Sequence, residues 1–153
     1  MSAQANNKSA QLTGLARALA QADRMPLRDV EELYRHARAS SRSFVEQVVS
    51  SGRISAAELA EFASQTFALP LLDLDAIDPD TIPLSLVDRK LIESRKVLPL
   101  RKRGNKLALA VSDPSNSQAL DEVKFQTGLA IDPVVVEDDK LGVLIGRLLA
   151  QHD

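Results

Sequence analysis

The residues from Arg101 to Asn116 are the first place in this chain to look for phosphate chemistry. They begin with a basic tip, RKRGNK, after an apolar run, and they end in the acceptor-rich turn SDPSN. A phosphate-binding loop places a glycine-containing turn and a lysine after a strand, but its full pattern G-x-x-x-x-G-K-[ST] is absent here, as is G-x-G-x-x-G. We therefore predict a hairpin turn at Gly104-Asn105. Ser112-Asp113-Pro114 is predicted to be the turn that begins the next helix.

Side chains suited to metal or nucleophilic chemistry are few. The chain has no cysteine, and its two histidines, His36 and His152, lie far apart in the sequence. The aspartates between residues 73 and 80 suggest Ca²⁺, but they lack the glycine and the closing glutamate of an EF-hand loop. A Ser-His-Asp or Cys-His set cannot be assembled from neighbouring residues. We expect no catalytic residue, no metal site and no cofactor in this chain.

The composition is typical of a soluble globular protein. Of the 153 residues 44% are hydrophobic and 26% charged, and the formal net charge is −2. With only 3% aromatic residues, the chain lacks the stacking surfaces and the basic charge of a nucleic-acid binder. No apolar run approaches a membrane span, and the first ten residues lack the apolar core of a secretion signal. We expect a cytoplasmic protein with a disordered lead-in over residues 1–11.

Positive charge has a different character in the two halves. In the second half it is concentrated, against a single Glu93, at Arg89, Lys90, Arg95, Lys96, Arg101, Lys102, Arg103 and Lys106. Such charge either keeps an exposed hairpin in solvent, which we favour, or forms a contact surface for an acidic partner, a phosphate group or an anionic membrane. In the first half nearly every cation is arginine, a residue favoured at interfaces. Candidate interface residues there are Arg17, Arg24, Arg28, Tyr34 and Arg35.

The elements that position these residues begin with a repeat. Leu15–Ala37 aligns with Phe44–Thr66, so that apolar residues coincide and each copy is a helix, a short break and a second helix. Ser55 and Glu58 form a capping box, and Pro26 suits the opening of a helix. We predict a helical subdomain of about four helices over residues 12–68, followed over 69–83 by a solvated linker.

Residues 84–153 are predicted to form a small α/β (α+β) subdomain of order αββαβα. Its elements, in order, are a helix over Leu84–Ser94, strands over Val97–Leu100 and Lys106–Val111, a helix capped by Ser117 that runs through Phe125 and is closed by Gly128, a strand over Ile131–Val136 and a last helix from Glu137.

The chain resembles the N-terminal region of the PilB family of type IV pilus assembly ATPases, which is related to the type II secretion and MshE ATPases. The resemblance covers Leu12 to Gln151 and is most specific over Arg95–Gly128. It implies a regulatory or anchoring region in pilus biogenesis and twitching motility, at the inner face of the bacterial inner membrane. The implied partners are a PilZ-type adaptor and components of the pilus platform. The family's hexameric motor, with its ATP and Mg²⁺, lies C-terminal to this region.

In MshE-like relatives the helical repeat binds cyclic di-GMP through two copies of a motif resembling R-L-G-x-x-L-V-x-x-G-L-I and a late glutamine. Leu15, Leu19, Val48, Gly52 and Ile54 preserve part of that pattern here. Its other key positions have changed: Gly14 and Ser43 replace the arginines, Ala37 and Thr66 the glutamines, and Ala16, Val45 and Asp23 the remaining glycines. We expect an interaction module that docks the adaptor without direct cyclic di-GMP binding. The alternative is a cyclic di-GMP sensor with degenerate motifs.

Overall fold

The computed structural model describes residues 12–40 and 42–151 of the chain. The expected lead-in over residues 1–11 lies outside them. The described part divides into two compact units, with the boundary between Ser55 and Ala56. This boundary falls earlier than the predicted end of the helical subdomain at residue 68. The helix Ala56–Phe67 therefore groups with the α/β unit instead of the helical repeat.

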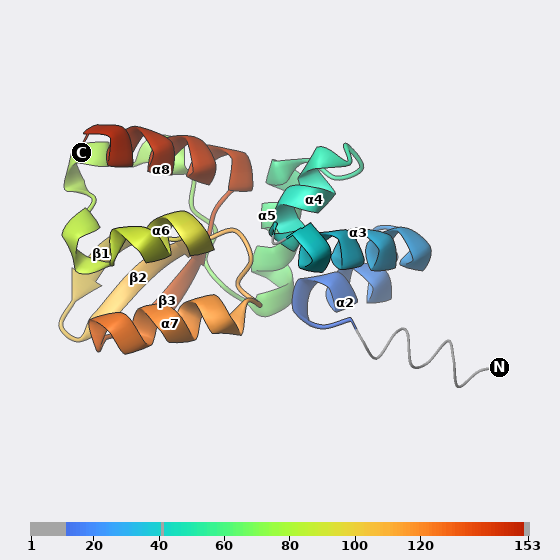
Figure 1. The fold of residues 1–153 in the computed structure, drawn as a ribbon, viewed down its shortest axis with the longest axis horizontal. Coiled ribbons are helices and arrows are strands. Elements are labelled where there is room, and N and C mark those ends of the chain that lie inside the picture. Colours follow the sequence, from blue (N-terminus) through green and yellow to red (C-terminus); the bar gives the residue numbers. More distant parts are fainter. Residues whose placement is uncertain (1–11, 41, 152–153) are drawn as a thin grey trace. The chain divides into compact units, whose positions relative to one another are not determined.

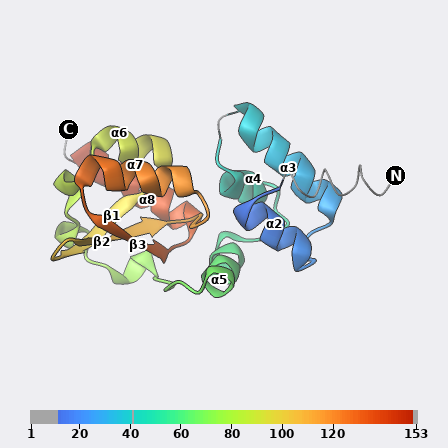
Figure 2. The same ribbon diagram turned by 90° about the horizontal axis from the view of Figure 1, so that it is seen from below.

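The first unit is helical and consists of α2 (Gly14–Gln21), α3 (Leu27–Ser40) and α4 (Phe44–Ser50). The first residues of two helices follow from local chemistry. Pro26 immediately precedes α3, and its carbonyl oxygen accepts from Val30 N. Ser43 precedes α4, and its Oγ accepts from Glu46 N at 3.0 Å. Helix α3 packs on both α2 and α4 (Figure 2). The largest fully buried side chains of this unit are Leu15, Leu19, Val30, Val45 and Val48.

The predicted repeat is confirmed in burial and in backbone shape. Every aligned apolar pair is buried except at Leu33, which is half-buried. The equivalent break positions Asp23 and Gly52 both have left-handed backbones, with φ of +55° and +77°. The hydrogen bonds that close the preceding helices also correspond, because the N–H groups of Ala22 and Ser51 donate four residues back in each copy. The two copies therefore share one helix-turn geometry.

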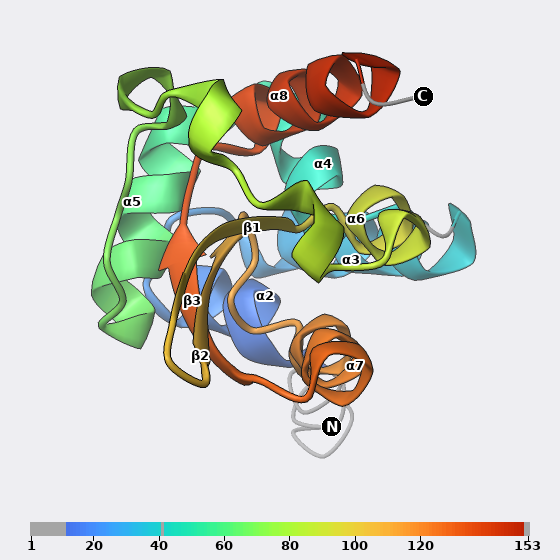
Figure 3. The same ribbon diagram turned by 90° about the vertical axis from the view of Figure 1, so that its left-hand side faces the viewer.

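The second unit has the predicted αββαβα order after its first helix, which makes it an α+β fold. Its elements are α5 (Ala56–Phe67), three 3₁₀ helices η1 (Leu74–Ala76), η2 (Pro79–Thr81) and η3 (Leu84–Leu86), then α6 (Arg89–Arg95), β1 (Leu98–Arg103), β2 (Lys106–Val111), α7 (Ser117–Thr127), β3 (Ala130–Val135) and α8 (Asp138–Gln151). Figures 1 and 3 show α6, α7 and α8 stacked along the sheet.

The sheet has the order β1-β2-β3. Strands β1 and β2 are antiparallel, with Arg103 opposite Lys106 across the predicted turn, where Gly104 has φ +62°. The hairpin prediction is thus confirmed. Strands β2 and β3 are parallel, because α7 carries the chain back to the edge of the sheet at which β2 begins, so that Ala130 pairs with Lys106. The core under the helices is formed mainly by Leu98, Leu107, Leu109, Val123, Ile92 and Leu141, each at most 1% exposed.

Two helix starts differ from the prediction. The single helix expected over Leu84–Ser94 is split into η3 and α6, because Asp88 caps α6 by accepting from Lys90 N at 3.1 Å. Asn116, and not Ser117, caps α7 by accepting from Ala119 N at 3.2 Å. In both cases a neighbouring Asx side chain supplies the cap.

Residues 69–83 differ most from the prediction, because they are not a solvated linker. Leu72 N donates to Val135 O at 2.9 Å, and Val135 N donates to Pro70 O at 2.8 Å, so the segment is bonded to β3. Leu74 and Ile82 are buried in the core of the α/β unit. The aspartates of the acidic run are exposed, as expected, and two of them also cap short helices: Asp73 caps η1 and Asp78 caps η2.

Candidate interaction surfaces

The arginine candidates of the first unit lie at its surface. Arg17 on α2 and Arg28 and Arg35 on α3 are exposed, and no hydrogen bond or ion pair in the described part of the chain involves their guanidinium groups. Arg28 and Arg35 are two helical turns apart and therefore share a face of α3, which is called the arginine face. Arg24 is exposed in the turn before α3. The guanidinium groups of Arg17, Arg28 and Arg35 are therefore available to carboxylates or phosphates of another molecule.

Tyr34 has a different environment from the arginines. Its hydroxyl lies 3.1 Å from Thr13 Oγ1, and its ring meets the ring of Phe44 edge-on with centroids 6.0 Å apart. The guanidinium carbon of Arg38 lies 5.8 Å from the centroid of the same ring. Tyr34 thereby connects the start of α2, α3 and the start of α4. The structure places it as a packing residue at the margin of the arginine face.

The motif positions shared with MshE-like relatives are mostly core. Leu15, Leu19, Val48 and Ile54 are at most 4% exposed, so their side chains pack inside the protein. Gly52 is exposed, and a Cβ built on it would meet nothing within 4 Å. Only the backbone at Gly52 is open to a ligand, and its φ of +77° accounts for the glycine without one.

The basic segment from Arg89 to Lys106 is divided between internal ion pairs and solvent. Arg89 pairs with Glu93, and Arg95 binds Glu122 through two hydrogen bonds of 2.8 and 2.6 Å. This bidentate contact raises the pKa of Arg95 and lowers that of Glu122. Four cations of the hairpin are exposed and have no partner within residues 12–40 and 42–151: Arg101, Lys102, Arg103 and Lys106.

The aspartates that suggested Ca²⁺ surround a lysine. Lys140 Nζ on α8 lies 3.0 Å from Asp73 Oδ1, 2.9 Å from Asp75 Oδ2 and 3.4 Å from Glu137 Oε2. These contacts raise the pKa of Lys140 and lower that of Asp73. Across the residues that the structure describes, no group of three or more His, Asp or Glu side chains is arranged to hold a metal ion.

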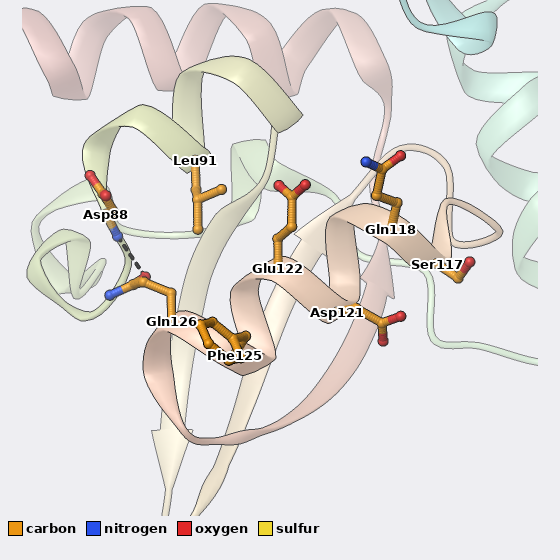
Figure 4. A pocket seen from close by; sticks show the side chains of 8 residues that line it. All are labelled: Asp88, Leu91, Ser117, Gln118, Asp121, Glu122, Phe125 and Gln126. Carbon is orange, nitrogen blue, oxygen red and sulfur yellow. Dashed lines mark hydrogen bonds between the residues drawn. The ribbon is translucent and has the colours of Figure 1, made fainter.

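Sequence reasoning did not identify a groove between α6 and α7. It has a volume of about 720 Å³ and is lined by Asp88, Leu91, Ser117, Gln118, Asp121, Glu122, Phe125 and Gln126. In Figure 4, Leu91 and Glu122 point toward each other from the two helices, with Phe125 beside them. Phe125 is 92% exposed. A signal was present in the sequence, since Phe125 comes two residues after the buried Val123 and so lies on the opposite side of the helix.

The MshEN domain model matches residues 67–153, which is more than half of the chain and nearly all of the α/β unit. This chain belongs to the MshEN domain family. The match leaves outside it α2, α3, α4 and all of α5 except its last residue, Phe67. Among the described residues, no helix has both the length and the apolarity to cross a membrane.

Two curated relatives of this MshEN protein are described as type IV pilus assembly ATPase PilB. The protein from Pseudomonas aeruginosa is 38% identical over 142 residues, which cover 93% of this chain and 25% of the relative. The protein from Acinetobacter baylyi is 32% identical over 140 residues, covering 92% of this chain and 24% of the relative. The chain thus spans about a quarter of the length of these relatives, in their N-terminal region.

Two solved structures share the fold of this MshEN protein. The N-terminal domain of XpsE gives a TM-score of 0.69 at 24% identity, covering 90% of this chain and 97% of that one. MshE, in a structure described as "with cdg", gives a TM-score of 0.63 at 22% identity, covering 89% and 99%. These likenesses confirm the α+β fold, and with the family match they confirm the resemblance seen in the sequence.

Proposed function

We propose that this chain is the N-terminal regulatory and protein-interaction region of a PilB-type pilus assembly ATPase, at the cytoplasmic face of the inner membrane. Its helical unit docks a PilZ-type adaptor and couples it to a C-terminal hexameric motor that binds ATP and Mg²⁺. Support comes from the identity to the N-terminal quarter of PilB proteins. The observation that carries the docking role is the unpartnered arginine face of the helical unit.

The arginine face is suited to a protein partner for three physical reasons. A guanidinium group is less strongly hydrated than an ammonium group and binds carboxylates in a bidentate geometry. Arg28 and Arg35 stand on a 14-residue helix whose other face is fixed in the core by Val30 and Ala37. Tyr34 fixes the ends of neighbouring helices next to this face. The cations are therefore presented on a rigid surface, which lowers the entropy cost of binding.

Titration calorimetry of this chain with a PilZ-type adaptor from the same organism tests the proposal. We expect binding, and we expect Arg28→Glu together with Arg35→Glu to weaken it about tenfold or more, because rim charges opposite carboxylates become repulsive. Arg42→Glu with Arg147→Glu is the matched control, since both residues are exposed and the change in net charge is the same. Absence of binding would overturn the function. Binding equal in the two double variants would overturn the proposed surface.

The same region is proposed to contact platform components of the pilus machine and to have no turnover of its own. We expect no ATP hydrolysis by the chain alone in a phosphate-release assay. Turnover that survives repurification, and that a second, independent preparation reproduces, would contradict this.

A second candidate function is sensing of cyclic di-GMP. It is favoured by one observation, the left-handed turn at both Asp23 and Gly52, which preserves the loop shape of the repeat. The structure described as MshE "with cdg" has the same fold. Equilibrium dialysis with labelled cyclic di-GMP separates the candidates. We expect no binding at micromolar concentrations, because the arginine and glutamine positions have changed. Micromolar binding that is lost in Gly52→Arg would establish the sensor instead.

A further inference from the structure

The α6–α7 groove combines an aromatic ring with the carboxylates of two aspartates that make no ion pair in the described part of the chain, Asp88 and Asp121. Asp121 lies one turn before Phe125 on α7, so the two side chains share a face of the helix. Asp121 is exposed and makes no ion pair in the described part of the chain. Gln126 Oε1 accepts from Asp88 N at 2.9 Å, a bond that joins the two helices at one end of the groove. Glu122 is neutralised by Arg95, so Asp88 and Asp121 supply the uncompensated charge.

This combination favours an arginine-bearing occupant. A guanidinium group stacks on an aromatic face through cation–π attraction and at the same time binds a carboxylate one helical turn away. An aliphatic occupant would cover Phe125 but leave the carboxylate of Asp121 without a partner. A lysine would satisfy Asp121 with a point charge but stack less well on the ring.

The chain itself presents an arginine-bearing element of matching shape. Arg101 and Arg103 are two residues apart on β1 and so point to the same face of the hairpin, where Lys106 lies directly opposite Arg103. All three are exposed, and no ion pair in the described ranges involves them. The two-residue turn at Gly104-Asn105 keeps the tip narrow. The name hairpin tip is used below for residues 101–106.

We propose that the α6–α7 groove binds the hairpin tip of a second copy of this chain. One guanidinium of the tip stacks on Phe125 and pairs with Asp121, and the second guanidinium and Lys106 add attraction toward Asp88 and Asp121. Within one chain the exposed cations of the tip make no ion pair with the groove, and β1, α6 and α7 are held in place by the same core. Two copies satisfy each other reciprocally, each giving its tip and receiving its partner's, which is the symmetry of a closed dimer.

The contact is small and built largely from exposed charges, so we expect a dissociation constant on the order of 0.1 to 1 mM at low salt. Association should weaken as salt is raised, because exposed ion pairs are screened. Sedimentation velocity from about 10 μM to about 1 mM brackets this constant. In parallel, the aromatic resonances of Phe125 are followed by NMR over the same concentrations, since they report on the groove directly.

Three variants test the assignment. The double variant Arg101→Glu with Arg103→Glu, and separately Asp121→Arg, should each lower the association constant about tenfold, because each makes the contact repulsive. Mixing these two variants should restore association, since the reversed tip of one meets the reversed groove of the other. Arg42→Glu with Arg147→Glu matches the charge change of the tip variant at residues that belong to neither the tip nor the groove, and it should behave as the wild type. Phe125→Ala should weaken association without unfolding the protein.

Several results would overturn the proposal. They are a chain that stays monomeric at about 1 mM, Phe125 resonances that do not move with concentration, association that survives both charge reversals, or a mixture of the two variants that fails to associate.

Discussion

Lys96 Nζ donates to Asp138 Oδ2 at 2.8 Å and ties the residue that ends α6 to the first residue of α8. The carboxylate of Asp138 also accepts from Ser112 Oγ at 2.7 Å, just after β2, and Asp138 is only 5% exposed. Lys96 reaches it from a left-handed backbone with φ +53°. Two helices and one strand therefore meet on one buried carboxylate.

Lys96→Met should lower the free energy of unfolding by about 3 kcal/mol, because it leaves a buried carboxylate without its counter-charge. Urea denaturation at neutral pH measures the difference. The matched control is Lys106→Met on the exposed hairpin tip, which should change stability by less than about 0.5 kcal/mol. Equal stability of the two variants would show that the ion pair does not hold the helices.

The two glycines of α8 should respond differently to alanine. A Cβ on Gly146 would meet nothing within 4 Å, whereas one on Gly142 would lie 3.2 Å from Lys96 Cε. Gly146→Ala should therefore raise the free energy of unfolding by about 0.5–1 kcal/mol through its helix propensity. Gly142→Ala should gain less, or lose stability, because the lysine stem must shift. Thermal denaturation of both variants decides the matter, and equal gains would contradict the contact.

The order of elements in the α/β unit could be predicted because strand and helix periods, the Gly104-Asn105 turn and Gly128 are local signals. The first residues of the helices were less predictable, because the N-caps Asp88 and Asn116 have neighbours of similar chemistry that could also act as caps. The prediction of a solvated linker over residues 69–83 was wrong, because it relied on the acidic run and gave too little importance to the apolar residues Leu74 and Ile82, which are buried. The counter-charge of that run, Lys140, comes from the last helix, and no local pattern indicates it.

The left-handed breaks of the repeat give a paired prediction. Gly52→Ala should lower the free energy of unfolding by about 1–2 kcal/mol, because a Cβ is strained at φ +77°. Asp23→Gly, at the equivalent position, should not lower it, because glycine adopts this backbone shape without strain. Chemical denaturation of both variants measures the effects. A neutral Gly52→Ala would mean that the break tolerates a side chain and that the repeat geometry is not what selects the glycine.

The contact between Arg95 and Glu122 predicts a dependence of stability on pH. Arg95 lowers the pKa of Glu122 below its ordinary value of 4.5. The stabilisation is therefore present above about pH 4.5 and is lost as the pH falls through the lower value of the folded state. Denaturation at pH values from 7 down to 3 should show a smaller acid loss in Glu122→Gln than in the wild type. Glu61→Gln, on the exposed side of α5, is the matched control; an identical pH profile in the wild type and Glu122→Gln would rule out this contribution.

The candidate surfaces show the same limit on prediction from sequence. The exposure of Arg17, Arg28 and Arg35 agrees with a helix whose apolar stripe points elsewhere, and such a stripe can be recognised in the sequence. The sequence does not reveal which cations of the basic segment form internal ion pairs and which face solvent, because the partners of Arg95 and Lys96 lie on α7 and α8. The α6–α7 groove was missed for a similar reason: it exists only once two helices that are separate in the sequence are placed side by side.

The hydrogen bonds between residues 70–72 and β3 cover part of one edge of the sheet, since β3 is an outer strand. Leu71 bridges Val135, so backbone groups at the end of β3 that would otherwise face outward are already paired. On the other side, Pro99 contributes no N–H, and the register of β1 shifts between Pro99 and Arg101. The cations Arg101, Lys102 and Arg103 follow on the same strand. Both margins are thus poor templates for a strand from another molecule, which protects the protein from growing into aggregated sheets.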